Sequence, residues 1–452
     1  MDAENIDELY ISYLFPPSND ASGITVFKRM VENNKKIDIL QGEFDSCCDL
    51  DNYLKPYINN RYCISINNNY DWAIFISEYI QKGIELINNK EYEKIYSRSW
   101  LMANHFLACE YKFNHPNVIW TAEFSDPLRY TVNNNLKTFK EMIIDDKEYI
   151  SKINNEIKRL DGDFPLIENN SSAFFIAEYI VYLFSDKIIF TNENQRQIMI
   201  DQFPIDIKEL VLLKSEIKTH PTLKDKFYHI KDVKLNLDKN CINLAYFGGD
   251  YYSKRHFESL FYAVNALNHK FKDKIKVHIF IKDTELIKNL KPSDNFIIKK
   301  PFEYLDFLNA TTKFDILIVN DVITKDTFEV NPYLPSKISD YVGSGRNIWA
   351  FYEEGSTLSK FDFKYKSDIN NYDDCLNKLV NILKDYGFDD PDYSIDDNYI
   401  YDRLTKLNEL YEKEYRRKIK VKKELNTFKE NESMKYSNSR KITKTLRNIR
   451  KK

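Results

Sequence analysis

The segment Asn331-Pro-Tyr-Leu-Pro-Ser-Lys-Ile-Ser-Asp-Tyr-Val-Gly-Ser-Gly345 is followed by an apolar run, Asn347-Ile-Trp-Ala-Phe-Tyr352. Pro335 suits the first turn of a helix because it has no N–H to leave unpaired there, and Gly343 and Gly345 permit a left-handed exit. The stretch therefore predicts a helix of barely two turns that leads into a strand. Backbone N–H groups at the start of such a helix attract an anion, which we expect to be a nucleotide diphosphate.

Three side chains of this predicted helix suit the same ligand. Ser336 and Asp340 are four residues apart and share one helix face, with Lys337 on an adjacent flank. A hydroxyl and an ammonium suit phosphate oxygens, and a carboxylate suits the paired hydroxyls of a ribose. A capped surface helix with an incidental ion pair would show the same residues, so both interpretations stay open.

Short β-rich runs alternate with helical patterns along the chain, which predicts an α/β protein with parallel sheets covered by helices on both faces. The expected strands are 8–15, 36–41, 61–66, 94–97, 118–124, 187–191, 242–247, 276–281, 296–300, 315–320 and 348–352. The clearest expected helices are 72–89, 101–112, 173–183, 257–271 and 373–386, with a further short helix between the strands 276–281 and 296–300. Two such doubly wound units leave a cleft at the carboxyl ends of their strands, where ligands bind.

The length of 452 residues suffices for two domains of about 200 residues and an extension. The expected division is an N-terminal Rossmann-like domain at 1–220, a linker at 221–240, a C-terminal Rossmann-like domain at 241–395 and a basic helical tail at 396–452. From residue 411 onward, 16 Lys and Arg stand against 5 Asp and Glu, a net charge of +11 that leaves −14 for the rest. The tail is either a solvated end or a segment that binds anionic lipid. Nucleic acid is not an expected partner, because no aromatic platform or helix-turn-helix accompanies the charge.

Cysteine spacing and hydropathy bear on the cellular compartment. The six cysteines show no CxxC spacing, so we expect reduced core residues rather than a zinc site or a disulfide framework. The acidic N-terminus differs from a signal peptide, and the longest apolar run, 174–184, is interrupted by Glu178 and too short to span a bilayer. We therefore expect a cytoplasmic protein, which the basic tail could hold at the inner face of the plasma membrane.

Five segments, in their order and spacing, resemble the family-four glycosyltransferases of the GT-B fold that build bacterial surface polysaccharides such as capsules and teichoic-acid-type cell-wall polymers. They are 15–23, 95–99, 120–127, 246–255 and the segment 331–345. The resemblance implies transfer of a hexosyl or N-acetylhexosaminyl group from a nucleotide sugar, most simply a UDP-sugar, to a glycan, lipid-linked or polymer acceptor. It also implies retention of configuration by front-face attack, in which the donor phosphate accepts the acceptor proton. We expect no cofactor and no metal, because the helix N-terminus with Lys337 and Arg255 could stabilise the diphosphate and no Asp-x-Asp string follows a convincing strand end.

The resemblance and the spacing together suggest a set of donor-binding residues. In this family the loop 246–255 carries an Arg beside the glycine and a Lys further on, which neutralise the leaving diphosphate. Gly249 stands at the Arg position here and Arg255 at the Lys position. The suggested set is Gly23, Gly248, Gly249, Lys254, Arg255, Pro335, Ser336, Lys337, Asp340 and Glu354. An ordinary strand-to-helix turn explains Gly23 equally well, and a solvated helix start would explain Lys254 and Arg255.

The family also places a His near position 125 and two glutamates eight residues apart near the phosphate helix. Ser125 stands at the His position, Pro332 at the first glutamate and Asp340 at the second. Glu329 is an alternative from the preceding loop, and Glu353 is an alternative to Glu354. These departures leave the contacts to the transferred sugar open.

Four residues of the first half are the catalytic candidates: Asp126, Ser125, Arg98 and His105. We expect Glu123, Ser125, Asp126 and Pro127 to face the cleft, with Asp126 holding an acceptor or sugar hydroxyl. Arg98 could pair with Asp126 in a buried salt bridge or bind an anionic acceptor. His105 lies on an apolar-patterned helix, where an imidazole is more often a packed core residue than a catalyst.

Two functions of other kinds remain open. A catalytically silent GT-B scaffold or chaperone for a partner enzyme would explain Ser125 and Pro332, but it would have no need of the Pro-Ser-Lys helix and Arg255. A nucleotide-sugar epimerase would need acid and base carboxylates in the cleft and no acceptor groove. Donor hydrolysis and product analysis without acceptor would separate the three.

Overall fold

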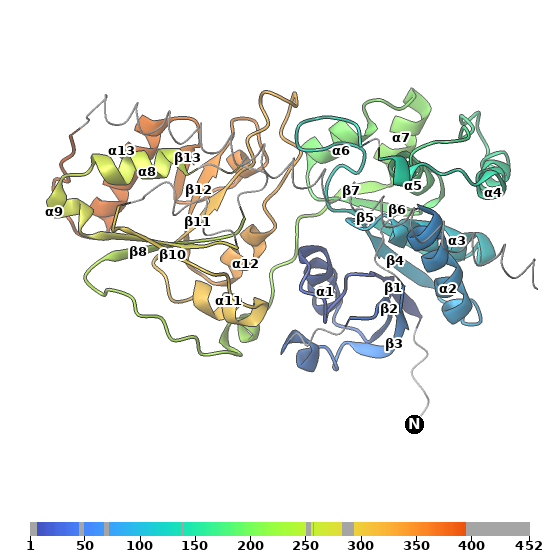
Figure 1. Cartoon of the computed structure of the whole chain (residues 1–452), viewed down its shortest axis with the longest axis horizontal. Helices are drawn as coiled ribbons and strands as arrows, with labels where there is room; N and C mark the ends of the chain where they lie inside the picture. The colour runs from blue at the N-terminus through green and yellow to red at the C-terminus, as the bar shows by residue number, and fades with distance from the viewer. Residues whose placement is uncertain are drawn as a thin grey trace, which may run out of the picture.

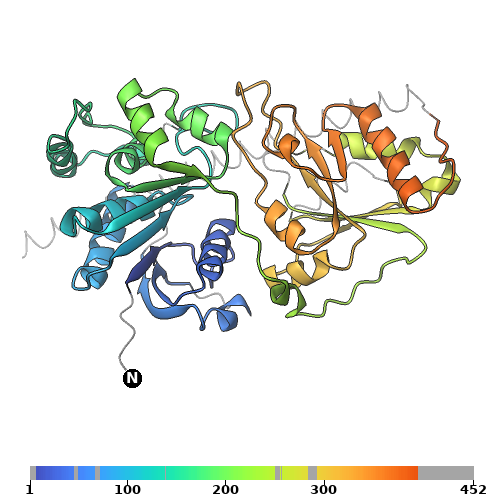
Figure 2. The same cartoon turned by 180° about the vertical axis from the view of Figure 1, so that it is seen from behind.

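The computed structural model describes residues 7–44, 49–66, 72–137, 139–249, 255, 257–282 and 293–394. These residues form two α/β lobes that lie side by side, the N-terminal one blue to green and the C-terminal one yellow to orange (Figure 1). Figure 2 shows from behind the green segment that runs from the N-terminal lobe to the C-terminal lobe. Within the described ranges, no helix combines the length and the apolar character needed to cross a membrane.

The N-terminal lobe contains a seven-stranded sheet in the order β3-β2-β1-β4-β5-β6-β7, in which every pair is parallel. The strands are β1 (Glu8–Ile11), β2 (Ile37–Gly42), β3 (Ile58–Ile64), β4 (Lys94–Arg98), β5 (Ile119–Phe124), β6 (Lys187–Phe190) and β7 (Ser215–Ile217). The strand order reverses between β1 and β4. Ligands of doubly wound sheets bind at the carboxyl ends of strands beside such a reversal.

Helices cover both faces of this sheet. They are α1 (Ala21–Asn33), α2 (Ser77–Ile87), α3 (Ala103–Asn114), α4 (Lys147–Ile157), α5 (Ala173–Phe184), α6 (Glu193–Ile200) and α7 (Ile205–Lys214), with short turns η1 (Asp49–Tyr53), η2 (Trp72–Ile76) and η3 (Lys140–Met142). Side chains alternate across β1: Leu9 and Ile11 pack in the core with α2, α3 and α5, whereas Tyr10 packs with α1 on the other face. Asp20 caps α1 by accepting from the Ser22 N–H, which starts this helix directly after the β1 loop.

The C-terminal lobe repeats the arrangement with six parallel strands in the order β10-β9-β8-β11-β12-β13. The strands are β8 (Ile242–Phe247), β9 (Ile275–Phe280), β10 (Phe296–Lys299), β11 (Ile316–Asn320), β12 (Asn347–Tyr352) and β13 (Tyr365–Asp368). The helices are α8 (Glu258–Ala266), α9 (His269–Lys272), α11 (Tyr304–Thr311), α12 (Lys337–Gly343) and α13 (Tyr372–Asp385), with turns η4 (Asp225–His229) and η5 (Leu358–Lys360). The order reverses between β8 and β11.

The short helix predicted after Pro335 is α12, which Ser336 precedes and which leads into β12 as expected. Gly345 has a φ of 68°, so the predicted left-handed exit is confirmed there. Gly343 instead ends the helix and serves close packing, because a Cβ at this position would lie 2.0 Å from the Tyr228 Oη. The left-handed role predicted for Gly343 is therefore wrong.

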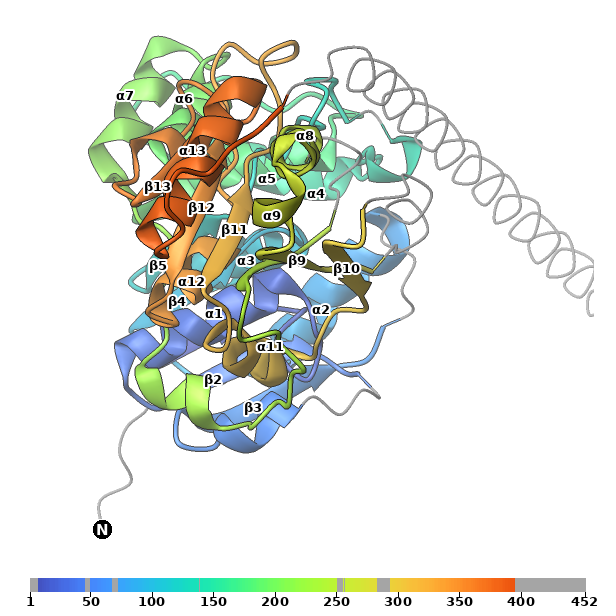
Figure 3. The same cartoon turned by 90° about the vertical axis from the view of Figure 1, so that its left-hand side faces the viewer.

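One hydrophobic core continues from the N-terminal lobe into the C-terminal lobe. The ring of Phe27 on α1 packs edge-on against Phe227 of η4, with the ring centroids 5.6 Å apart. Ile338 and Tyr341 of α12 belong to the same buried cluster. Figures 1 and 3 both show α1 beside α11 and α12. The lobes are thus fastened along this side of their interface.

The predicted strands all exist with small shifts of their ends, whereas the short strands β7 and β13 were not predicted. The two sheets are connected by residues 218–241, of which η4 packs against α11. The helix predicted after 276–281 and the basic tail at 411–452 lie outside the described residues. Of the cysteines that the structure describes, Cys109 and Cys375 are buried as predicted, but Cys63 is exposed and Cys241 is partly exposed, so the core prediction is wrong for these two.

Candidate functional site

A buried ionic network occupies the carboxyl ends of β4 and β5. The Glu123 carboxylate accepts from Arg29 Nε at 2.9 Å, Arg98 Nε at 3.1 Å and Tyr96 Oη at 2.8 Å. Burial opposes the charge of Glu123, but the guanidinium groups of Arg29 and Arg98 outweigh it and lower the pKa to about 2. Glu123 is fully buried, so it does not face the cleft as predicted.

Arg98 has two further contacts that hold its guanidinium in place. Its Nη1 donates to Ser22 Oγ at 2.6 Å, and its Nη2 lies 3.3 Å from His220 Nε2. The partner carboxylate of Arg98 is therefore Glu123, and the predicted pairing with Asp126 is wrong. The sequence analysis did not include His220 among the site residues. No local motif indicates that a residue in the segment between the two sheets lies beside β4.

Asp126 lies where charges of both lobes meet. Its side chain is half-buried, and burial raises its pKa. The positive charges of Arg98, Lys137 and Arg255 oppose this shift. Arg255 follows β8 in the C-terminal lobe. Because its charge acts on the pKa of Asp126, Asp126 lies at the interface between the lobes.

The neighbours of Asp126 differ in exposure. Ser125 is half-buried like Asp126, whereas Pro127 is buried within the N-terminal lobe. The predicted cleft-facing set of strand-end residues therefore reduces to Ser125 and Asp126.

His105 is a core residue of α3. Its Nδ1 lies 2.8 Å from Ser97 Oγ, which also accepts from Trp120 Nε1 at 2.8 Å, and its ring packs edge-on against Phe124. Burial, with a smaller effect from the charge of Arg98, lowers the pKa of His105 to about 3. This environment favours the packed core interpretation over the catalytic one.

In the C-terminal lobe, Lys337 at the start of α12 lies over the ring of Phe307, with Nζ 4.4 Å from the centroid. Burial lowers the pKa of Lys337. The charges of Lys28 and Arg255 lower this pKa further, whereas the charge of Asp340 raises it. Pro335 is buried and Ser336 is half-buried beside it. Three cations drawn from both lobes therefore surround the start of α12.

Asp340 is occupied by protein groups. Its Oδ1 lies 2.6 Å from Lys28 Nζ of α1 and accepts from Tyr304 Oη at 2.8 Å. Lys28 also donates to Ser339 Oγ at 2.9 Å, and both charged side chains are almost completely buried. This carboxylate links α12 to the other lobe through its Oδ1, and the expectation that Asp340 receives the hydroxyls of a ribose stays a prediction.

The glycines of the predicted donor site have structural roles of their own. Gly23 lies in the first turn of α1, where a Cβ would lie 1.9 Å from the carbonyl oxygen of Leu14, so the close packing of the helix start requires a glycine there. A Cβ at Gly248 would lie 2.7 Å from Tyr246 Oη, which donates to the carbonyl oxygen of Gly249 at 2.8 Å. Lys254 lies outside the described residues.

Three carboxyl groups follow β11 and β12. Glu353 is buried and accepts from the Thr324 and Lys325 N–H groups and from Asn331 Nδ2, each at 2.8 Å, while Glu354 is exposed. Burial raises the pKa of Asp321 to about 7, although Ser356 Oγ donates to its Oδ2 at 2.6 Å. Sequence reasoning missed Asp321, whose position directly after a buried strand was the available signal.

A second contact between the lobes lies at the loop that precedes α12. Asn192 Nδ2 donates to the carbonyl oxygen of Pro332 at 3.0 Å, and Asn194 Nδ2 donates to those of Asn331 at 2.9 Å and Gly355 at 3.0 Å. Pro332, which stands at the first glutamate position of the resembled family, therefore offers its backbone to the other lobe.

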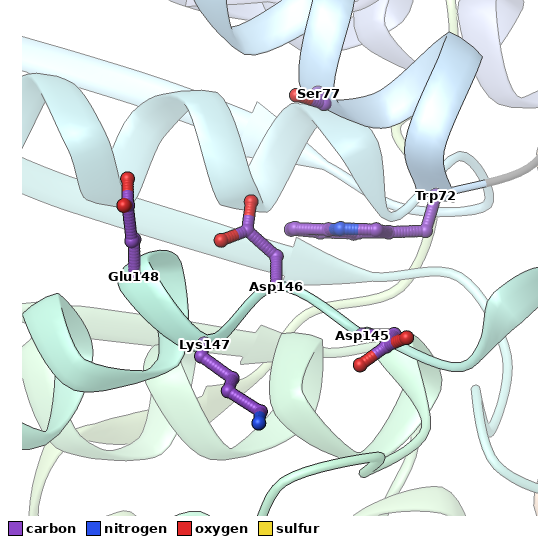
Figure 4. Close-up of a pocket in the computed structure, with 6 residues that line it drawn as sticks. All are labelled: Trp72, Ser77, Asp145, Asp146, Lys147 and Glu148. Atoms are coloured by element: carbon purple, nitrogen blue, oxygen red, sulfur yellow. The ribbon is translucent and has the colours of Figure 1, made fainter.

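A hollow of about 460 Å³ lies elsewhere, between η2, the start of α2 and the start of α4. Figure 4 shows the Asp146 side chain between the indole of Trp72 and Glu148, with Lys147 extending away. Its other lining residues are Ser77, Asp145 and Glu148. The three carboxylates would repel a diphosphate, so this hollow is unsuited to the expected ligand.

No protein-family model matches the sequence, and no curated protein matches it significantly. Solved structures do match it. The Anabaena protein HepE, in complex with UDP and glucose, is 11% identical, with a TM-score of 0.50 over 84% of this chain and 90% of that chain. The apo structure of OtsA is 11% identical, with a TM-score of 0.50 over 90% and 94%. An E. coli trehalose-6-phosphate structure bound with UDP-2-fluoro glucose is 10% identical, with the same score and coverage.

The chain has the GT-B fold. This confirms the predicted fold class, two Rossmann-like lobes that face each other. In this GT-B chain the order of strands reverses at β1/β4 and at β8/β11, and Arg98 ends β4 while Asp321 directly follows β11. Membership of family four stays a prediction, because at this identity the likeness extends to the fold alone.

Proposed function

We propose that this GT-B chain is a glycosyltransferase that takes a sugar from a nucleotide-diphosphate sugar. The observation that carries the proposal is the position of Arg255, whose charge acts on Lys337 in its own lobe and on Asp126 in the other. A diphosphate between Arg255 and Lys337 would place the attached sugar toward Asp126. The structural neighbours that contain UDP or a UDP-sugar support a nucleotide-sugar ligand.

In this arrangement each group has a chemical role. Arg255 and Lys337 stabilise the negative charge that develops on the departing diphosphate as the sugar carbon gains oxocarbenium character. Asp126, half-buried and with a raised pKa, accepts a hydrogen bond from a sugar or acceptor hydroxyl. Arg98 acts indirectly, because it is buried and bonded to Glu123.

The finer features of the proposal rest on the resemblance of the sequence. They are a UDP-hexose or UDP-N-acetylhexosamine donor, retention of configuration without a metal, and a glycan, lipid-linked or polymer acceptor of bacterial surface polysaccharide synthesis. A cytoplasmic location, with the basic residues 411–452 at an anionic membrane surface, belongs to the same proposal.

The direct test is donor binding to the full chain with and without Lys337. Calorimetric titration with UDP, UDP-glucose and UDP-N-acetylglucosamine should give binding to the wild type and none to Lys337→Ala, since that variant loses a cation beside the diphosphate. Circular dichroism should show an intact fold. Lys360→Ala, an exposed lysine of η5, is the matched control and should bind as the wild type does. Equal affinity of Lys337→Ala and wild type would overturn the assignment.

A nucleotide-sugar epimerase is a second candidate, because two carboxyl groups with raised pKa values, Asp126 and Asp321, both lie within the field of Arg255. Acid and base catalysis needs groups that exchange protons near neutral pH. Product analysis after incubation with a UDP-sugar alone decides between the two. An epimerised nucleotide sugar identifies the epimerase, and slow release of UDP and free sugar identifies the transferase.

A further inference from the structure

His220 occupies a fixed position in the segment that connects the two lobes. The carbonyl oxygens of Lys218 and Thr219, directly before it, accept from Arg29 Nη2 at 3.0 and 2.9 Å. Leu223, three residues later, is buried in the core that the lobes share. The backbone around the imidazole is therefore anchored to the N-terminal lobe on one side and to the shared core on the other.

The contact with Arg98 decides which ring nitrogen of His220 carries the proton. Arg98 Nη2 lies 3.3 Å from His220 Nε2, and a guanidinium can only donate. His220 Nε2 is therefore the acceptor, and the proton of the neutral ring is on Nδ1. Glu123 and Ser22 hold the guanidinium in this orientation from its other nitrogens.

Charge and burial keep the ring neutral. Burial, followed by the charge of Arg98, lowers the pKa of His220 to about 3. Lys28 and Arg29 act in the same direction, and Glu123 opposes them. The imidazole at neutral pH is thus a fixed dipole with its N–H on the side away from Arg98.

Exposure separates His220 from the rest of this network. Glu123 and Arg98 are at most 2% exposed, whereas His220 is only half-buried. Among the described residues, no second donor contacts His220 Nε2, and no acceptor contacts its Nδ1–H. The imidazole is therefore more accessible to a ligand than either charged group.

We propose that His220 contacts the ligand, its Nδ1–H donating to a hydroxyl oxygen of the sugar carried by the nucleotide. This inference rests on the proposed function. The diphosphate is assigned to Arg255 and Lys337 in the C-terminal lobe, and His220 belongs to the side where Arg98 and Asp126 lie. The group that extends from the diphosphate toward that side is the sugar, whose hydroxyl oxygens accept hydrogen bonds from a neutral donor.

The test compares UDP with UDP-sugars on four full-length proteins: wild type, His220→Leu, His220→Gln and His229→Leu. By calorimetry, His220→Leu should weaken UDP-glucose or UDP-N-acetylglucosamine about fivefold, as expected for one neutral hydrogen bond, and leave UDP unchanged. His220→Gln should restore most of the affinity, since its amide oxygen can accept from Arg98 while its NH₂ donates. His229→Leu, an exposed histidine of the same segment, should match the wild type.

Three results would overturn the inference and leave the proposed function standing. The first two concern His220→Leu: an unchanged affinity for the UDP-sugar, or an equal loss of affinity for UDP and for the UDP-sugar. The third is a wild type that binds UDP as tightly as it binds the UDP-sugar. A wild type that binds no nucleotide would overturn the proposed function and this inference together. Nitrogen-15 NMR of labelled histidines gives a readout that needs no ligand. It should show the His220 proton on Nδ1, and a proton on Nε2 would contradict the assigned geometry.

Discussion

At the scale of single residues, the charges of the N-terminal lobe are arranged around one carboxylate. Glu123 is shared by Arg29 and Arg98, which come from α1 and β4, and all three side chains are buried. Removing one member of a buried ionic group leaves the others without compensation, which costs more than the group contributes as a whole. The network therefore holds α1 against the sheet and fixes the guanidinium that contacts His220.

Glu123→Gln should lower the free energy of unfolding by roughly 3 to 5 kcal/mol, because two buried guanidinium groups lose their carboxylate. Urea denaturation at pH 7 measures the loss, with the exposed Glu216→Gln as the control that should stay near the wild type. An equal stability of Glu123→Gln and wild type would show that the network does not contribute to folding.

The same residue predicts a pH dependence. The pKa of Glu123 is lowered from 4.5 to about 2, so the unfolded chain binds more protons than the folded chain between these values. Its contribution is fully present above about pH 5 and falls by roughly 3 kcal/mol as the pH drops through 4.5 toward 2. Glu123→Gln should lose less stability than the wild type over this range.

At the scale of elements, α12 depends on close contact with the segment that connects the lobes. A Cβ on Gly343 would meet Tyr228 Oη at 2.0 Å and the Thr222 methyl carbon at 2.8 Å. Gly345 has open space around it but a φ of 68°. The two glycines are thus required for different reasons, one for packing and one for backbone conformation.

Gly343→Ala should destabilise the protein by about 1 to 3 kcal/mol through overpacking and weaken UDP binding, because α12 must shift away from Tyr228. Gly345→Ala should cost about 1 kcal/mol through strain alone and leave UDP affinity intact. Thermal denaturation and calorimetric titration of both variants separate the effects. Equal UDP affinity of the two variants would contradict a link between the packing of α12 and the ligand site.

At the scale of the whole molecule, the lobes share a core and a buried ion pair. Lys28 of α1 and Asp340 of α12 are 2.6 Å apart, and the apolar cluster that includes Phe27, Phe227 and Tyr341 surrounds this side of the interface. Most of the stabilisation comes from apolar burial, and the ion pair specifies how α1 and α12 meet. The lobes should therefore unfold together.

Scanning calorimetry of the wild type should show one transition, and Lys28→Met should lower its midpoint by leaving Asp340 buried with Tyr304 as its remaining side-chain partner among the described residues. The double variant Lys28→Met/Asp340→Asn should recover part of the loss, giving a coupling energy on the order of 1 to 3 kcal/mol. Two separate transitions, or additive losses in the double variant, would contradict a shared core with a coupled ion pair.

The sequence by itself determined the alternation of strands and helices, the two parallel sheets and the position of α12. These features depend on residue preferences within a few positions. Examples are the β-rich run of β12, and Pro335 and Gly345, which mark the start and the end of α12. The short strands β7 and β13 were not predicted, because three or four residues show too little periodicity to indicate a strand.

Only the tertiary structure decided the partners of the charged residues. Asp340 pairs with Lys28, 312 positions away, and Arg98 meets His220, 122 positions away. Such pairs form because two lobes pack in one relative orientation, and a buried charge accepts whichever opposite charge or acceptor that packing brings within reach. No pattern in the neighbouring residues encodes this choice, which is why the sequence predicted the position of α12 but not the charged groups that surround it.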